Sequence, residues 1–277
     1  MGGTKEKIGR EFAAMSRELS VELQGLAAAA ATARAEVRAY EMPEGLEGAP
    51  FETAYAFQEA LVAATNARVG GHKLAVNGAP QMAHFGVSDP AAGRILADEM
   101  YESDAVLHSS RFQEIGIEPE LAAVMGPGVA DLDGPVDRAT AMAAIVCFRP
   151  AIELIDQRGV PMPKVELAQA IAVNVFNAGI VLGRGSIAPD ALDLDALEVT
   201  LDLDGARVGT ATGAAPQHPC DAVAWLIGHL ARRGQRLDPG MVVMCGTHLP
   251  LRVLDPEARQ VEVTMGGLGR VGFTVAA

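Results

Sequence analysis

The amino-acid sequence predicts an α+β protein in which a helical N-terminal region, residues 1–70, precedes a β-rich body, residues 71–277. Two observations support this prediction. Residues 5–40 are rich in Ala, Glu, Leu and Arg and contain no proline, a composition typical of a helix. After residue 71, short apolar runs are separated by Gly, Pro and Asp, without the regular alternation of strands and helices that builds a parallel sheet.

The helices and strands can be placed in order. The stretch "EMPEGLEGAP" interrupts the first helical pattern, and a second helix is expected at 51–69, ending at the Gly-Gly pair 70–71. Two more helices are expected near 165–173 and 221–233. An Asp-Gly dipeptide between two alternating runs predicts a β-hairpin in "VTLDLDGARVGT". Further strands are expected in "GIEPELAAVMG", "AAIVCFRPAIELI", "AGIVLG", "MVVMCG", "RQVEVTM" and "RVGFTVA".

Composition narrows the function classes. The formal net charge of −13 argues against nucleic acid as a partner, because nucleic-acid-binding proteins usually carry a basic surface. The three cysteines, Cys147, Cys220 and Cys245, have the spacing of neither a disulfide framework nor a zinc motif. The segment "MGGTKEKIGREF" lacks the apolar core of a signal peptide, and no run approaches the ~20 apolar residues of a membrane span. We therefore expect a cytoplasmic protein that does not bind a membrane.

Two glutamates interrupt the apolar run "RFQEIGIEPELAAVMG" at alternate positions. In a strand, residues i and i+2 share a face, so Glu118 and Glu120 would lie side by side, where like charges repel. One interpretation is a strand whose glutamate face meets water. Against it, Ala122 and Val124 continue that face and are apolar.

A third acid, Glu153, stands in the apolar run "AAIVCFRPAIELID". It could form a buried ion pair with Arg149 or Arg158, an explanation as good as any other from the residues alone. Three carboxylates in apolar strands have a further explanation. A hard divalent cation, Mg²⁺ or Mn²⁺, takes oxygen ligands and offsets their mutual repulsion, so a metal site is the alternative hypothesis.

The chain resembles the fumarylacetoacetate hydrolase superfamily from about residue 51 to the C-terminus, most closely its branch of 2-keto-4-pentenoate hydratases and 4-oxalocrotonate decarboxylases. The resemblance implies a mixed, rolled β-sheet core with flanking helices. It is carried, in the family's order, by "GGHKLAVNG", "GVSDP", "IEPELA", "PAIEL", the Asn of "AVNVFNAG", "HPCDAVAWL" and "GQRLDPGMVVMCG".

The resemblance also implies a site. A Glu-x-Glu pair and a later acid hold a divalent metal in the family, and these positions correspond to Glu118, Glu120 and Glu153; the active-site lysine corresponds to Lys73. The implied substrate is a small 2-oxo acid that chelates Mg²⁺ or Mn²⁺, which stabilises an enolate at the 2-oxygen. Lys73 would hold the substrate carboxylate, or move protons if burial lowers its pKa.

Departures from the family bear on the reaction. Hydratases of this branch usually carry an acid in a Pro-Asp-aromatic-Gly stretch, where this chain has Ala91 and Ala92. Hydration needs an activated water, so the loss favours decarboxylation of a 4-oxalocrotonate-like acid, with hydration of 2-hydroxypenta-2,4-dienoate as the alternative. His84 or Asp89 could replace the missing base, although a histidine in a loop is more often solvated.

Other departures concern the pocket. Asn77, Asn174, Phe176 and Cys245 occupy positions that line or support the substrate pocket in relatives, so they are candidate substrate-binding residues, and Cys245 is interpreted as a small buried thiol rather than a nucleophile. The altered pocket leaves open a second class of function, a metal-binding pseudoenzyme or the assembly partner of a sister lyase. Homo-oligomers are common for this fold, so a homo-oligomer is expected by analogy.

Overall fold

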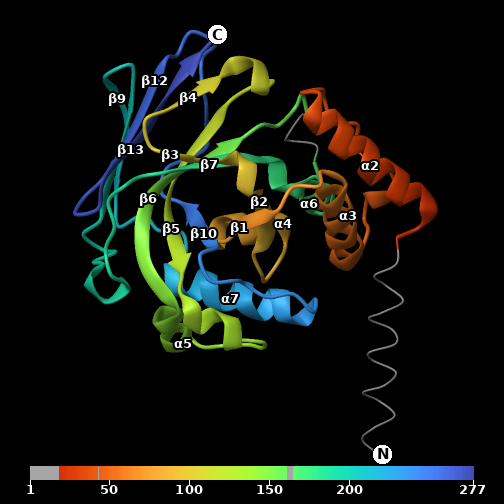
Figure 1. The fold of residues 1–277 in the computed structure, drawn as a ribbon, viewed down its shortest axis with the longest axis horizontal. Helices are drawn as coiled ribbons and strands as arrows, with labels where there is room; N and C mark the ends of the chain where they lie inside the picture. The colour runs from red at the N-terminus through yellow and green to blue at the C-terminus, as the bar shows by residue number, and fades with distance from the viewer. Residues whose placement is uncertain (1–18, 43, 161–164) are drawn as a thin grey trace, which may run out of the picture. The chain divides into compact units, whose positions relative to one another are not determined.

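The computed structural model describes residues 19–42, 44–160 and 165–277 (Figure 1). The chain forms two compact units. One consists of the chain up to Ala67 together with Gln157–Phe176, and the other of Arg68–Asp156 together with Asn177–Ala277. The helix expected near 165–173 therefore belongs with the N-terminal helices, whereas the division at residue 70 assigned it to the β-rich body.

Three α-helices make up the described part of the first unit: α2 (Val21–Ala35), α3 (Phe51–Ala64) and α6 (Leu167–Ala172). Helix α3 packs against both α2 and α6, and the buried Gln58 donates from Nε2 to the carbonyl of Ile171 at 2.8 Å. Of the helix expected at residues 5–40, the described residues contain α2, and residues 1–18 lie outside the described part.

The second helix is shorter than predicted. It ends at Ala64, and Asn66 has a left-handed φ of 57° that terminates it. The Gly-Gly pair 70–71 is not a helix stop, because both glycines lie in strand β1 (Val69–Ala75). A Cβ on Gly71 would approach the carbonyl oxygen of Val242 to 2.2 Å, so glycine is needed there for the close approach of a neighbouring strand.

The described residues of the second unit contain an eight-stranded mixed sheet, in the order β2-β1-β10-β5-β6-β7-β3, with β11 paired to β5. Strands β1 and β10 are parallel, as are β3 and β7, and the other pairs are antiparallel. The sequence-predicted strands β5, β6, β7 and β10 are confirmed. The strand bounds besides β1 are β2 Ala91–Leu96, β3 Met100–Glu102, β5 Gly116–Met125, β6 Ile145–Ile155, β7 Asn177–Leu182, β10 Val242–Thr247 and β11 Arg252–Val253.

A second, five-stranded sheet has the order β4-β13-β12-β8-β9 within the described residues. The predicted hairpin is confirmed: Asp204 and Gly205 connect β8 to β9 with φ of 49° and 80°, as a tight turn between two twisted strands requires. The bounds are β4 Ala105–His108, β8 Glu198–Leu203, β9 Ala206–Thr212, β12 Gln260–Met265 and β13 Gly269–Ala276.

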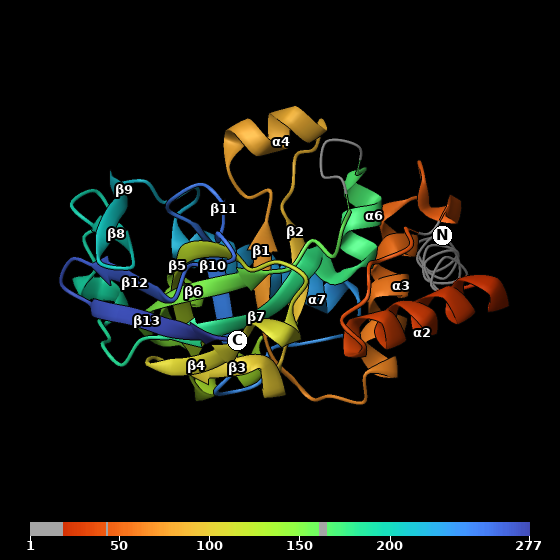
Figure 2. The same cartoon turned by 90° about the horizontal axis from the view of Figure 1, so that it is seen from above.

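Three α-helices belong to this unit. Helix α7 (Pro219–Arg232), predicted at 221–233, packs on β10 and β5, and α5 (Arg138–Ala144) packs on α7 (Figure 1). Helix α4 (Ala79–Phe85) buries none of its residues and stands away from the sheet (Figure 2). The sequence analysis missed α4 and α5, because seven residues are too few to show a helical period.

The two faces of the large sheet carry different residues. Alternate residues of β1 point to opposite faces, so Lys73 and His72 lie on opposite sides. The face that carries Lys73 continues into a core cluster, and on the other face His72 lies near Arg94 of β2 and His229 of α7. The core cluster consists of Ile95, Ala122, Ala151, Ile180, Leu182, Val242 and Met244.

The buried His72 makes stability depend on pH. Burial, and then the nearby positive charge of Arg94, lowers the pKa of His72 to about 3. The unfolded chain takes up a proton near pH 6.5 and the folded chain does not, so stability falls as pH decreases from 6.5 toward 3. We expect His72→Gln to remove about 2 kcal/mol of that loss at pH 5. Urea unfolding at pH 7 and pH 5 measures it, and equal losses in both proteins would contradict the prediction.

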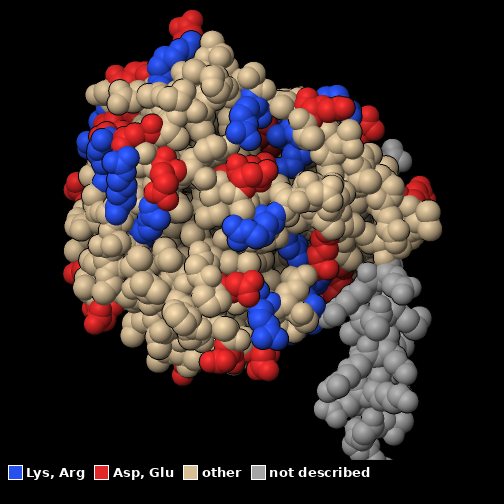
Figure 3. Space-filling model, in the orientation of Figure 1, with Lys and Arg blue, Asp and Glu red and all other residues tan. Residues whose placement is uncertain are grey.

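The described surface visible in Figure 3 carries basic side chains, all of them arginines because Lys73 is buried, intermixed with acids rather than gathered into a basic patch. This face offers no broad positive surface to a polyanion. Among the described residues, no helix is both long enough and apolar enough to cross a membrane.

Candidate metal centre

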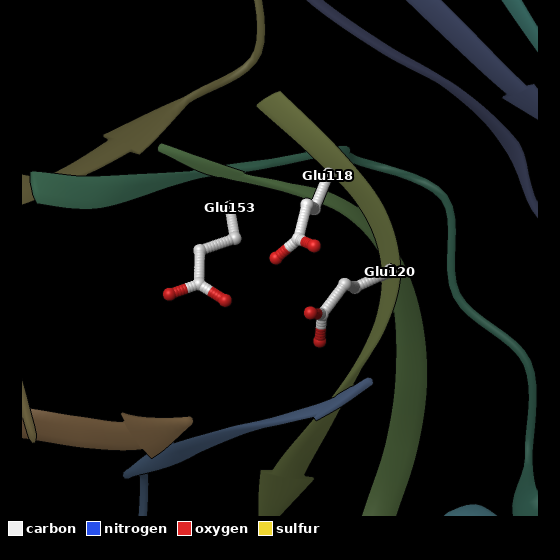
Figure 4. Close-up of side chains that lie close together, drawn as sticks. All are labelled: Glu118, Glu120 and Glu153. Atoms are coloured by element: carbon white, nitrogen blue, oxygen red, sulfur yellow. The ribbon is translucent and has the colours of Figure 1, made fainter. Parts of the chain in front are cut away.

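Strand register brings the three predicted glutamates together. Glu118 of β5 lies directly opposite Glu153 of β6, and Glu120 shares the face of Glu118 because it is two residues further along the strand. Figure 4 shows the three carboxylates pointing into one shared space. One oxygen from each lies within 4.8 Å of the others. A cation of ordinary size can therefore contact all three.

Lys73 lies on the same face of the sheet. It is opposite Met244 of β10, which in turn is opposite Ala122 of β5, two residues beyond Glu120. Its Nζ lies 3.2 Å from Oε1 of Glu153, and both side chains are almost fully buried. The sequence therefore predicts an ion pair for Glu153 correctly but names the wrong partner.

The two expected partners are occupied elsewhere. Arg149 forms an ion pair with Glu102 at 2.6 Å, and Arg158 donates to the carbonyl of Arg34 in the helical unit. Arg149 lies opposite Ala122 of β5, four positions before Glu153 on the same strand. Its guanidinium also donates to the carbonyl of Gly183. The partner of Glu153 thus comes from a strand that is distant in sequence.

The charged groups of the site shift one another's pKa values. Burial alone would lower the pKa of Lys73, but the attraction of Glu153, Glu118 and Glu120 outweighs it and raises the pKa, so the ammonium stays charged. Burial, and then the charge of Glu153, raises the pKa of Glu118 to about 7 and that of Glu120 well above its ordinary value. With all three carboxyl groups ionised, as metal binding requires, the cluster would carry two negative charges in excess of the one ammonium. A divalent cation supplies the charge that compensates them.

Hydrogen bonds hold one oxygen of each buried glutamate. Oε1 of Glu153 accepts from Nδ2 of Asn177 at 2.9 Å as well as from Lys73. Oε2 of Glu153 is buried and has no hydrogen-bond partner among the described residues. Oε2 of Glu120 accepts from the backbone N–H of Gly246 at 2.7 Å. A buried carboxylate oxygen without a donor is costly, so the residues present fit a metal ion bound by oxygen ligands.

The comparisons with known proteins agree with this geometry. The family model described as the fumarylacetoacetate (FAA) hydrolase C-terminal domain matches residues 72–276. The chain belongs to the fumarylacetoacetate hydrolase family. The match covers the whole second unit apart from a few residues at its start and its end.

Its relatives within the family include both reaction types expected from the sequence. The chain is 31% identical over 211 residues to 2-oxo-hept-4-ene-1,7-dioate hydratase of Escherichia coli, which covers 71% of this chain and 76% of the relative. It is 29% identical over 272 residues to 4-oxalocrotonate decarboxylase of Pseudomonas putida, covering 93% and 98% of the two chains. The relatives are enzymes, and both kinds are lyases.

A solved structure confirms the expected fold. The 4-oxalocrotonate decarboxylase from Pseudomonas putida G7, complexed with magnesium and adipate, matches with a TM-score of 0.83 at 24% identity, covering 94% of this chain and 99% of that chain. The mixed sheet core with flanking helices that the resemblance implied is therefore the fold of this member of the fumarylacetoacetate hydrolase family.

The segment "AVNVFNAG" carries a residue that the sequence analysis missed. The resemblance singled out Asn174, yet the side chain that reaches Glu153 is that of Asn177, at the first position of β7. Asn174 and Phe176 are buried in the helical unit, within a turn where Asn174, Val175 and Phe176 have left-handed φ of 61°, 48° and 58°. The available signal was the start of an apolar strand at Asn177.

Two other predicted pocket residues lie beside Glu120. Asn77 is buried and donates from Nδ2 to the carbonyl of Cys245 at 2.8 Å. The thiol of Cys245 donates to the carbonyl of Val243, and burial, then the charge of Glu120, raises its pKa well above the ordinary value. The thiolate is therefore disfavoured, in agreement with the interpretation as a small buried thiol.

The candidate substitutes for the missing hydratase acid are poorly suited to act as a base. Hydrogen bonds from Trp225 and Ser88 lower the pKa of Asp89, which makes its carboxylate a weaker base. His84 is exposed on α4, where its ring meets Phe85 edge-on. Ala91 and Ala92 are buried within β2 and offer no polar group.

Proposed function

We propose that this chain is a divalent-metal-dependent lyase that decarboxylates a 4-oxalocrotonate-like 2-oxo acid. One observation carries the proposal: carboxylate oxygens of Glu118, Glu120 and Glu153 lie within 4.8 Å of one another beside a buried lysine. The set consists of oxygen donors only and lacks imidazole and thiolate, which suits Mg²⁺ or Mn²⁺ better than zinc or copper. A relative with this fold is known in complex with magnesium.

The proposed chemistry divides between the cation and the chain. When bound, a divalent cation supplies Lewis-acid stabilisation of the negative charge that develops at the 2-oxygen as CO₂ leaves. Lys73 keeps its proton because of the surrounding carboxylates, so it acts as a fixed positive charge that orients a substrate carboxylate rather than as a base in the resting site. Asn177 and Lys73 together hold Glu153 in one orientation.

The chain's own residues favour decarboxylation over hydration. Loss of CO₂ requires a place for an electron pair and no activated water, whereas hydration requires a base near the reacting carbons. Ala91 and Ala92 provide no such base, and Asp89 is held by Trp225. Hydration of 2-hydroxypenta-2,4-dienoate is the alternative, supported by the similarity to a hydratase.

The decisive experiment is CO₂ release from 2-oxo-3-hexenedioate by the purified protein with Mg²⁺, and with EDTA as the control. We expect release that depends on the metal and stops on chelation. Absence of release, together with metal-dependent consumption of 2-hydroxypenta-2,4-dienoate, would replace decarboxylation by hydration. Absence of both reactions in a protein that still binds Mn²⁺ would instead favour the metal-binding pseudoenzyme or the partner of a sister lyase.

We also propose that the chain acts in the cytoplasm as a homo-oligomer. The similarity to a 4-oxalocrotonate decarboxylase along 93% of this chain supports this proposal. Light scattering during size-exclusion chromatography measures the mass of the assembly directly. A measured mass of 28.8 kDa, which is the mass of a single chain, would contradict the homo-oligomer.

A further inference from the structure

The peptide group between Cys245 and Gly246 is hydrogen-bonded at both of its polar atoms. Its C=O accepts from Nδ2 of Asn77 at 2.8 Å, and its N–H donates to Oε2 of Glu120 at 2.7 Å. Because this C=O and N–H belong to one planar amide, the position of the Asn77 side chain and that of the Glu120 carboxylate are coupled through a single rigid group.

The backbone on both sides is shaped for this arrangement. Gly246 has a φ of 106°, and a Cβ there would lie 2.5 Å and 2.6 Å from Oδ1 and Nδ2 of Asn77. The register of β10 against β5 shifts between Met244 and Thr247, which turns the peptide toward Glu120. Val76, directly before Asn77, has a left-handed φ of 56°, which costs roughly 1–2 kcal/mol in a β-branched residue.

The donors of Asn77 are both directed at protein atoms. One N–H of Nδ2 is bonded to Cys245, and Oε1 of Gln217 lies 3.5 Å from the same nitrogen. Donation to a peptide C=O polarises the amide and strengthens its N–H as a donor. The N–H of Gly246 is therefore a stronger hydrogen-bond donor to Oε2 of Glu120 when Asn77 is in place.

We propose that Asn77 is a positioning residue of the metal centre, acting on Glu120 through the Cys245–Gly246 peptide. The proposal rests on the proposed function in that Glu120 is taken as a metal ligand. It differs from the substrate contact expected from the sequence, because the Nδ2 group of Asn77 donates to the protein framework. Residues that orient metal ligands typically change metal affinity 10–100-fold when they are replaced.

The test measures Mn²⁺ affinity by electron paramagnetic resonance on protein that was first freed of metal. Asn77→Leu keeps the volume and removes the donor, and Asn77→Ala removes the donor without any risk of overpacking. We expect both to weaken Mn²⁺ binding about tenfold. Asn77→Thr restores a donor, and we expect it to recover most of the affinity.

The matched control is Ser103→Ala. Ser103 is also buried and accepts from the N–H of Gly272 at 3.1 Å, in the connection between β3 and β4. We expect this variant to lose some stability and to keep its Mn²⁺ affinity. Equal weakening in Ser103→Ala would show a general loss of structure and overturn the proposal.

A second readout separates positioning from substrate contact. Unchanged Mn²⁺ affinity in folded Asn77→Leu and Asn77→Ala, with a raised KM, would assign Asn77 to the substrate and overturn the proposal. The amide proton of Gly246, observed by NMR in protein labelled with ¹⁵N-glycine, should move upfield in both variants and return in Asn77→Thr. Failure of the proposed decarboxylation would leave these metal-free and Mn²⁺ measurements unaffected, so the two ideas fail separately.

Discussion

Replacing Glu118 or Glu120 by Gln should abolish metal-dependent turnover. Gln keeps the shape of the side chain and removes the charge that a hard cation requires. A Lewis acid supplies several kcal/mol of transition-state stabilisation, and each 1.36 kcal/mol is a factor of ten, so we expect activity to fall by roughly three orders of magnitude. The measurement is the initial rate of CO₂ release at saturating Mg²⁺, together with Mn²⁺ affinity.

The control is Glu102→Gln, at a carboxylate that is largely exposed and paired with Arg149. This variant removes one negative charge without touching the cluster, and we expect its turnover to match that of the unaltered protein. Unchanged turnover in both Glu118→Gln and Glu120→Gln would sink the assignment of these residues as metal ligands.

Replacing Lys73 by Met should destabilise the metal-free protein more than any surface substitution. Lys73 is the positive charge within contact of Glu153, and both side chains are buried. Removing one partner of a buried ion pair typically costs 3–5 kcal/mol, because the remaining charge stays buried without compensation. We expect a loss of about 3 kcal/mol in EDTA by urea unfolding, a smaller loss in saturating Mg²⁺, and no detectable turnover.

The matched control is Arg207→Met. Arg207 pairs with Asp202 at 2.6 Å, but its side chain is 53% exposed, and exposed pairs contribute at most about 1 kcal/mol. An equal loss of stability for Lys73→Met in EDTA and in Mg²⁺ would contradict the electrostatic explanation and leave lost packing as the cause.

Much of the fold follows from local pattern. The runs that became β5, β6 and β10 are mainly apolar, and those of β5 and β10 lie next to glycines, whereas the Asp204-Gly205 turn identifies its hairpin without reference to the rest of the chain. Sequence patterns gave wrong predictions where a contact between distant parts of the chain determines the residue. The glycine at 71 resembles a helix stop, and its real cause is the backbone of Val242, 171 residues further along.

Some residues of the candidate site could also be predicted from the sequence, and others could not. Glu118, Glu120 and Glu153 could be identified because carboxylates in apolar strands need an explanation and the family motif supplies one. The pairing of Lys73 with Glu153 could not, because it depends on the order β1-β10-β5-β6, which brings distant strands together. Asn177 was missed for the same reason: its contact with Glu153 depends on the pairing of β6 with β7, and the chain itself offers only the start of an apolar strand as a signal.

Glu118, Glu120 and Glu153 belong to two central strands of the large sheet, β5 and β6. Strand β5 is paired on one side with β10 and on the other with β6, which is itself paired with β7. Backbone with hydrogen bonds on both sides opens only in large unfolding events, so its amide protons should exchange with solvent very slowly. The proposed ligands should therefore lose little conformational entropy when a cation binds, because the framework is already organised. We therefore expect that a chelator removes a bound cation from the proposed site and that a different divalent metal can then be loaded without a change in this framework.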